Sequence, residues 1–334
     1  MPGARTEITE IATGLGTLVP DLEAAVACPP ERLRNVGDDV WERFVAAFRA
    51  GEQEASFAAA FANGVAFLWA DDGLRLRPPR AVEWKGPHRP PGDDVVPADL
   101  RIDHVFSISC KYLSRILQNP GPARLFDRCL VGEERAGLDW FGEVAPAEYQ
   151  ALYDAVRADV GPGLPARVGD LAAPDRAMLK VALRPLRKLP SPAAERWAEL
   201  CAAVAQASAT RWRERLGDLR RDLRLLWRLL RIGDAPYYVL GTDERGCSLR
   251  LRVASTWDWV QGWELRAFDV ASRPAGQPEV TWRAVVRDRA TGAETEVHGH
   301  VEVRWSHGRF SGAPEAKVYL DSPLADVPGY WPLV

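Results

Sequence analysis

The sequence contains few cysteines, and they are not paired at short spacings. The five cysteines are scattered along 334 residues: Cys28, Cys110, Cys129, Cys201 and Cys247. This spacing fits neither a disulfide framework nor a zinc site, and a reducing cytoplasm is the simplest expectation. No apolar run approaches the roughly 18 residues of a membrane span, and the N-terminus lacks a basic stretch followed by an apolar core. We therefore expect a chain that is neither exported nor inserted in a membrane.

The sequence also lacks a strong net charge and a phosphate-binding loop. Its 43 basic and 46 acidic residues leave a formal net charge of −3. Binding to nucleic acid would therefore depend on a local basic surface. No GxxxxGK[ST] sequence is present, which argues against a P-loop nucleotide hydrolase.

Hydrophobic patterning predicts an α+β protein with three consecutive regions. We expect an α/β core over residues 1–125, a helical region over 126–235, and an antiparallel β meander or sandwich over 236–334. In the first region the pattern predicts a helix over 38–64, strands over 64–73, 81–86 and 102–112, and a helix over 113–118. In the last region the turn at 287–294 is the clearest hairpin signal.

The segment from 191 to 232 predicts one long helix or two stacked helices. Apolar residues recur there at spacings of four and three, as in a heptad seam, at Trp212, Leu216, Leu219, Leu223, Leu226 and Leu230. Such a seam predicts a partner helix, from the same chain or from another subunit.

Arginine is concentrated in the second half of this segment. Residues 210–231 contain eight arginines against three acids. Arginine suits phosphate because its planar guanidinium donates two parallel hydrogen bonds. One face of this helix is a candidate for binding the DNA backbone through Arg213, Arg220, Arg224 and Arg228. The alternative is a solvated helix exterior with intrahelical ion pairs.

The densest set of chemically active residues lies between 80 and 117. Two strand-like segments, RAVEWKG and LRIDHVFSISCKY, carry Glu83, Asp103 and Lys111, with Asp99 just before the second. Alternation along a strand places Ser109 and Lys111 on one face with Asp103. A lysine beside carboxylates is suited to divalent-metal hydrolysis of a phosphodiester. Ordinary surface ion pairs are the alternative interpretation.

These residues resemble the motif of the PD-(D/E)xK superfamily of restriction-endonuclease-like nucleases, over about residues 38–120. By position, Asp99 would be the strand acid, and Ser109-Cys110-Lys111 would replace the acid-x-lysine element. Ser109 departs from the motif, so the missing acid would come from Glu83, Asp103 or Asp127. A second alignment places Asp72 before Glu83-Trp84-Lys85, but Lys85 leads into a proline-rich loop.

The resemblance implies a catalytic set of Lys111, Asp103, Asp99, Glu83 and Ser109. Mg²⁺ or Mn²⁺ would be held by Asp99, Asp103 and Glu83, while Lys111 would stabilise charge on the phosphate. The expected function is a metal-dependent endonuclease acting on DNA in defence against foreign DNA; an RNA substrate would use the same chemistry. The alternative is a non-catalytic assembly or adaptor subunit that forms homo-oligomers, or binds a helical partner, through the heptad helix and the β region.

Overall fold

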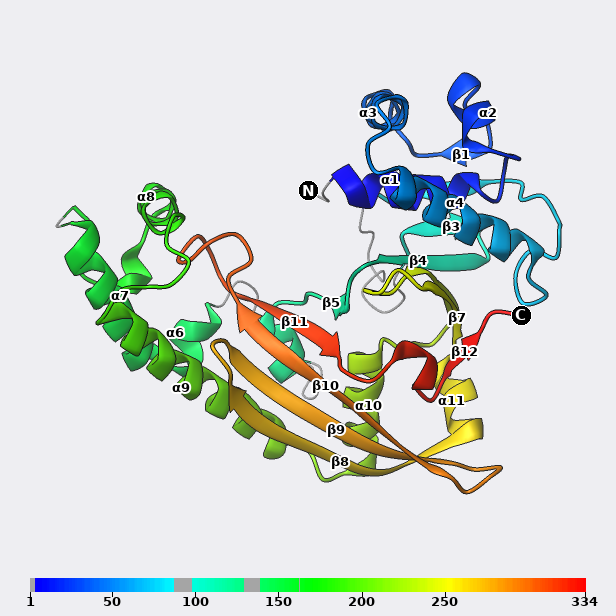
Figure 1. The fold of residues 1–334 in the computed structure, drawn as a ribbon. Helices are drawn as coiled ribbons and strands as arrows, with labels where there is room; N and C mark the ends of the chain where they lie inside the picture. Colours follow the sequence, from blue (N-terminus) through cyan, green and yellow to red (C-terminus); the bar gives the residue numbers. More distant parts are fainter. Residues whose placement is uncertain (1–3, 87–97, 129–138, 162) are drawn as a thin grey trace. The chain divides into compact units, whose positions relative to one another are not determined.

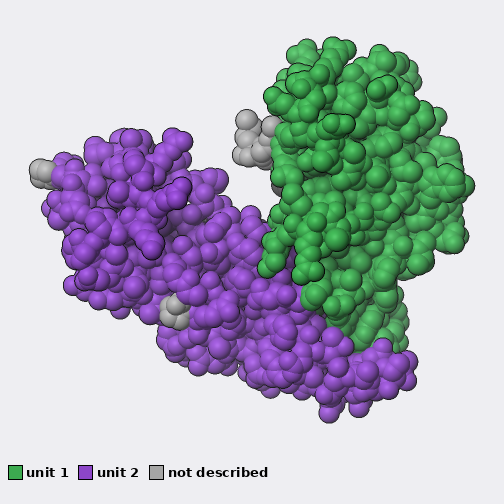
Figure 2. All heavy atoms as spheres, viewed as in Figure 1, with its two compact units in different colours: residues 1–115, 230–263, 323–334 green, residues 116–229, 264–322 purple. Residues whose placement is uncertain are grey.

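The computed structural model describes residues 4–86, 98–128, 139–161 and 163–334. It contains helices together with mixed and antiparallel sheets, so the predicted α+β class is confirmed. The chain forms two compact units, coloured separately in Figure 2. Unit 1 comprises residues 1–115, 230–263 and 323–334, and unit 2 comprises 116–229 and 264–322.

Unit 1 is built on a seven-stranded sheet with helices α1 and α4 packed on it (Figure 1). The sheet order is β1-β2-β3-β4-β6-β7-β12, with β1–β2 and β4–β6 parallel and the other pairs antiparallel. Its strands are β1 (Leu33–Arg34), β2 (Val82–Trp84), β3 (Leu100–Ile102), β4 (Phe106–Tyr112), β6 (Tyr237–Thr242), β7 (Ser248–Val253) and β12 (Tyr330–Pro332). Its helices are α1 (Ala4–Leu15), α2 (Leu22–Ala27), α3 (Asp38–Arg49), α4 (Glu54–Trp69) and α11 (Thr256–Gly262), with a 3₁₀ turn at Leu324–Asp326.

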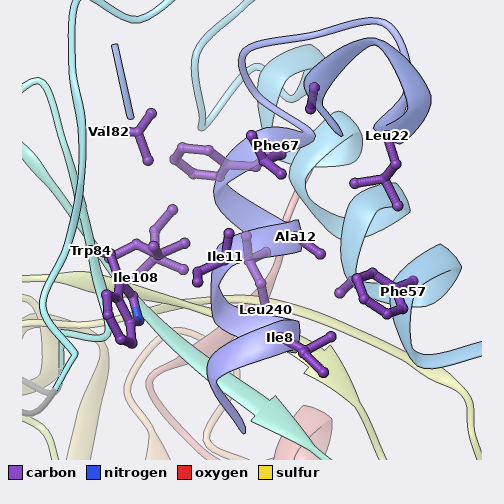
Figure 3. Close-up of a cluster of buried hydrophobic side chains, with 14 of the residues drawn as sticks. Ile8, Ile11, Ala12, Leu22, Phe57, Phe67, Val82, Trp84, Ile108 and Leu240 are labelled. Carbon is purple, nitrogen blue, oxygen red and sulfur yellow. The ribbon is translucent and has the colours of Figure 1, made fainter. Parts of the chain in front are cut away.

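The core of unit 1 lies between these helices and one face of the sheet (Figure 3). Ile11 of α1 is fully buried among side chains from β2, β4 and β6. Except for Glu7 and Glu10, helix α1 beyond its first two residues carries only apolar, small or hydroxyl side chains, which is typical of a helix buried on most sides.

Helix α4 continues through Gly64, where the sequence predicted that a helix ends and a strand begins. The predicted strand over 64–73 is therefore wrong: its apolar half belongs to α4, which ends at Trp69. A short apolar run fits a buried helix as well as a buried strand. A Cβ at Gly64 would lie 2.0 Å from the carbonyl oxygen of Thr13 and 2.9 Å from the Cα of Gly16. Gly64 thus allows α1 and α4 to pack closely.

The helix predicted over 113–118 is also absent. After β4 the chain instead forms β5 (Ile116–Gln118), which pairs with β11 in unit 2. The sequence LSRILQ is short, and pairing with a strand some 200 residues later overrides its weak helical preference.

Unit 2 combines helices with a five-stranded sheet of order β5-β11-β10-β9-β8. The other strands are β8 (Trp263–Pro274), β9 (Pro278–Asp288), β10 (Glu294–Arg304) and β11 (Glu315–Leu320). The helices are α6 (Trp140–Val144), α7 (Pro146–Val160), α8 (Ala173–Leu183), α9 (Ala193–Arg213) and α10 (Leu219–Leu230), with a π-helical turn at Arg124–Arg128 and a 3₁₀ turn at Val168–Asp170. Helix α9 packs against β9. The chain passes between the units after residue 115, at the end of α10, at the start of β8 and after residue 322.

The strands after residue 236 do not form the single C-terminal domain expected from the sequence. Strands β6 and β7 join the sheet of unit 1, whereas β8 to β11 form a meander in unit 2. The predicted hairpin at 287–294 is confirmed: Arg287 pairs with Glu294, and Gly292 has a φ of 74°. Local turn chemistry identifies the hairpin, but it does not indicate which sheet a strand joins.

The predicted heptad seam is interrupted. Helices α9 and α10 are separated by residues 214–218, where Gly217 has a φ of 102°. Trp212, Leu226 and Leu230 are fully buried within this chain, whereas Leu219 is 58% exposed. Of the two alternatives predicted for 191–232, the structure shows two helices, so the heptad periodicity is divided between α9 and α10 and is not carried by one continuous helix.

The close packing of α1 and α4 at Gly64 predicts that a larger residue there destabilises the fold. Gly64→Ala should lower the free energy of unfolding by about 1–3 kcal/mol, because the methyl group would force α1 away from α4. Thermal and urea unfolding followed by circular dichroism would measure the effect. The matched control is Gly262→Ala, where a Cβ meets nothing within 4 Å. Equal stability of the two variants would contradict the assigned role of Gly64.

Candidate active site at strands β3 and β4

The two faces of strands β2, β3 and β4 differ in chemistry. Val82, Trp84, Leu100, Ile102 and Ile108 face the helices and are buried. The alternate positions turn to the other face of the sheet, as strand geometry requires: they are Glu83, Asp99, Arg101, Ser109 and Lys111. Ser109 and Lys111 lie at alternate positions of β4, on one face, as alternation predicts.

Asp99 is held directly against β4. Its Oδ2 accepts a hydrogen bond of 2.7 Å from the backbone N–H of Cys110 and one of 3.4 Å from the Oγ of Ser109. Its own backbone N–H donates to the carbonyl of Ile108 at 2.8 Å. These bonds fix the Asp99 carboxylate beside the Ser109-Cys110-Lys111 segment, as expected from the sequence.

Lys111 is a partly buried cation beside this carboxylate. Burial lowers the pKa of the Lys111 ammonium, and the nearby Arg231 acts in the same direction. The charges of Asp99 and, more weakly, Glu10 favour the protonated form, but the net pKa is still lowered. Lys111 therefore lies among charged groups of both signs, and Asp99 is the acid that acts on it most strongly.

Glu10 of helix α1 is a site residue that the sequence interpretation missed. Its side chain is buried, at 5% exposure, and its Oε2 accepts a hydrogen bond of 2.7 Å from the Nε1 of Trp84. The charges of Asp99 and Glu10 both raise the pKa of the Cys110 thiol, in which burial is the largest cause. The two carboxylates thus act on the same residues of β4. One signal was available in the sequence: Glu10 is the only charged residue between Glu7 and Leu15 of a helix.

Glu83 is engaged in a separate ion pair. Its Oε2 lies 2.8 Å from the Nε of Arg101 and 3.1 Å from the Nδ1 of His104. Burial alone would raise the pKa of Glu83, but the hydrogen bonds and charges of Arg101 and His104 outweigh it and lower the pKa. Glu83 lies on the face expected for it, but its charge is balanced by these neighbours and not by Lys111.

Asp103 lies in the turn between β3 and β4, away from the predicted site. Its φ is 52°, and its Oδ1 accepts hydrogen bonds from the backbone N–H groups of Arg80 and Ala81 at 2.6 and 3.1 Å. Its Oδ2 lies 3.1 Å from Arg77. The length of β4 separates Asp103 from Lys111 by about 20 Å. The prediction that Asp103 and Lys111 share a strand face is therefore wrong, because a hairpin turn interrupts the strand between them.

The remaining acids that the sequence offered are also used elsewhere. Asp127 lies in unit 2 and pairs with Arg211 at 2.7 Å and Arg215 at 2.6 Å. Asp72 follows α4 in a turn and is not on a strand; its Oδ1 lies 3.7 Å from the Nη1 of Arg252. The alternative alignment through Asp72 thus lacks its first strand.

The candidate nucleic-acid arginines lie on two helices. Arg220, Arg224 and Arg228 recur at intervals of four on α10, so they share one face, while Arg213 ends α9. Arg213, Arg220 and Arg224 are exposed and Arg228 is half-buried.

Among the described residues, no three or more His, Cys, Asp and Glu side chains are grouped to hold a metal. Mg²⁺ commonly binds through one or two carboxylates and completes its shell with water and substrate phosphate. Asp99 supplies one carboxylate beside the Ser109-Cys110-Lys111 segment, whereas Glu10 approaches β4 from the helix side, where it accepts from Trp84. The predicted ligands Glu83 and Asp103 are directed to other partners.

The chain was compared with protein-family models, curated proteins and solved structures. No protein-family model matches it, and neither a curated protein nor a solved structure does so. Across the part of the chain that the structure describes, no helix has the length and hydropathy to cross a membrane.

The environment of Cys110 gives a test of this arrangement. Because Asp99 and Glu10 raise the pKa of the Cys110 thiol, Asp99→Asn and Glu10→Gln should each lower that pKa and speed alkylation severalfold near pH 8. Quantitative mass spectrometry after iodoacetamide pulses would measure the rate, with the exposed Cys28 and Cys247 as internal references. Glu83→Gln serves as the control and should have a smaller effect. An equal change of alkylation rate in all three variants would refute the specific action of Asp99 and Glu10 on Cys110.

Proposed function

We propose that this protein is a divalent-metal-dependent phosphodiester hydrolase that acts on DNA. The observation that carries the proposal is the position of Asp99, bonded to the backbone of Cys110 and acting on Lys111, with the buried Glu10 acting on the same two residues. Two acids from different elements thus act on the same two residues of β4, one of which is Lys111.

The residues have distinct roles in this proposal. Asp99 would hold Mg²⁺ or Mn²⁺, which when bound polarises the phosphate and lowers the pKa of a bound water. Glu10 adds negative charge from the helix side of β4. The Cys110 N–H and the Ser109 hydroxyl orient the Asp99 carboxylate. Lys111 donates hydrogen bonds to a phosphate oxygen and offsets the charge that develops there.

Burial explains why a lysine is effective at this position. The Lys111 ammonium has lost part of its hydration, so its interaction with a phosphate is weakened less by water than at an open surface. A phosphodiester approaching Lys111 brings negative charge and favours the protonated lysine. Substrate binding and the required protonation state therefore support each other.

In unit 1 the strands β2, β3 and β4 pair antiparallel in chain order, and β6 pairs parallel with β4. The resemblance implied a strand over 64–73 and a helix over 113–118, where the structure has the end of α4 and strand β5. The proposal therefore depends on the residues around Lys111 and not on the order of elements.

Cleavage assays test the hydrolase. With Mg²⁺ or Mn²⁺ the purified chain should cut plasmid, linear or single-stranded DNA, and EDTA should abolish cleavage. Lys111→Ala, Asp99→Asn and Glu10→Gln should each reduce the rate by roughly 100-fold or more, because each removes charge from the reacting centre.

Two matched variants separate these residues from the original candidates. Glu83→Gln and Asp103→Asn should retain cleavage within about threefold once the folded fraction is normalised by circular dichroism. Failure of the wild-type chain to cut any of the DNA forms, or full activity in Lys111→Ala, would refute the proposal. Loss of metal binding by Asp99→Asn, followed by Mn²⁺ electron paramagnetic resonance, provides a readout that does not depend on turnover.

The exposed arginines of α10 offer a surface for the DNA backbone. Arg220→Ala with Arg224→Ala should weaken DNA binding and reduce the dependence of log affinity on log salt by about two, since each phosphate contact contributes a slope of about 0.9. Electrophoretic mobility shifts at several salt concentrations would measure this slope. An unchanged slope would place the DNA contact on another surface.

The assembly alternative is less well supported, because the heptad seam on which it relied is divided between α9 and α10. The described cysteines are unpaired, which suits the reducing cytoplasm expected from their spacing.

A further inference from the structure

Unit 2 contains a pocket of about 420 Å³. This volume lies within the range of roughly 300–1,000 Å³ typical of small-ligand sites. Its walls come from the end of α8 and the turn after it, from α9, from the β8–β9 turn, and from the loop after β10. Figure 1 shows α8 and the loop after β10 at the same end of unit 2.

The lining of the pocket is strongly basic. It includes Lys180, Arg184, Arg304 and Arg309, and no carboxylate is among the lining residues. Lys180 and Arg184 are exposed, and no acid occurs in the sequence between Asp175 and Glu195. The site therefore favours an anion.

Two glutamates pair with residues of this lining, but only with Arg304 and His307. Glu302 lies 3.2 Å from Arg304, and Glu315 lies 3.8 Å from the Nε2 of His307. Neither glutamate is paired with Lys180 or Arg184 by a described contact. Lys180 and Arg184 are thus the cations best placed for a ligand.

Two indole rings form the apolar part of the lining. Trp197 and Trp305 are stacked, with ring centroids 5.7 Å apart and planes inclined by 24°. Trp197 donates from Nε1 to the carbonyl of Gly276 at 3.0 Å, which fixes its ring. Both rings are half-buried, so each still presents surface.

The loop after β10 is tied to the α8 side of the pocket. Arg309 donates to the backbone carbonyls of Leu186 and Arg187 at 2.8 and 3.2 Å. Gly308 has a φ of 112°, and a Cβ there would lie 3.2 Å from the Cγ of Lys180. The walls are therefore joined by specific contacts before any ligand arrives.

We propose that this pocket binds a nucleotide, with the base against Trp197 and Trp305 and the phosphate at Lys180 and Arg184. Aromatic rings stack on nucleobases and arginine forks bind phosphate, so the two halves of the lining match the two halves of a nucleotide. An acidic peptide would use the cations but not the indole pair. The ligand is either a free nucleotide or one unit of a single strand of nucleic acid.

Equilibrium binding to the full chain tests this proposal, in EDTA so that no cleavage occurs. The probes are adenosine monophosphate, adenosine, inorganic phosphate, oligo(dA) and poly-glutamate, measured by calorimetry and by fluorescence anisotropy of labelled probes. Adenosine monophosphate should bind at least tenfold more tightly than adenosine or phosphate alone. Oligo(dA) binding tenfold tighter still identifies a strand as the ligand, and tighter binding of the mononucleotide identifies a free nucleotide.

Variants assign the binding to the pocket. Lys180→Ala with Arg184→Ala should weaken nucleotide binding at least tenfold, and Trp197→Leu should do so without changing phosphate binding. Arg167→Ala removes an exposed arginine outside the lining and should have no effect. Lys111→Ala should bind adenosine monophosphate as tightly as the wild-type chain, which separates this proposal from the hydrolase.

Three results would overturn the proposal. These are no binding of adenosine monophosphate or oligo(dA), equal binding by the Lys180 and Arg184 double variant, and binding of poly-glutamate alone.

Discussion

The parallel pairing of β4 with β6 is the contact on which the candidate site depends. Lys111 lies opposite Gly241, and a Cβ at Gly241 would fall 1.6 Å from the carbonyl oxygen of Lys111, so no other residue fits without displacing β4. Asn63 of α4 donates to the carbonyl of Gly241 at 2.8 Å and so ties this pair to a helix. Parallel strands require a long crossover, and here it includes the helices of unit 2. Lys111 is thus positioned by contacts that span the sequence.

Local patterns predicted those features that local chemistry decides. The hairpin at 287–294 follows from its turn residues, and the placement of Ser109 and Lys111 on one face follows from alternation along β4. Long-range contacts decided the rest. The segment after Gly64 is helical because α4 packs on α1, and LSRILQ is extended because β11 pairs with it. Neither partner can be identified from the periodicity of the segment itself.

The difference between local patterns and long-range contacts also explains which site residues were predicted wrongly. Asp99 was predicted from its position before Ser109-Cys110-Lys111 in the resemblance, and its bond to the Cys110 N–H places it beside that segment. Asp103 was misassigned because two residues with positive φ, Asp103 and His104, turn the chain where alternation assumed a continuous strand. Glu10 was missed because its approach to β4 depends on how α1 packs on the sheet, and only the lack of other charges on that part of α1 marked it.

The serine at position 109 is consistent with the charge balance around Lys111. Ser109 is 1% exposed, and a carboxylate there would lie beside Asp99 and near Glu10 with Lys111 as the adjacent cation. Three negative charges around one ammonium in this partly buried region would repel one another, and at least one would take up a proton. With serine, the hydroxyl instead donates to Asp99, and the second acid is supplied from α1. The number of acids near Lys111 is thus kept at two, although their origin differs from that expected along the strand.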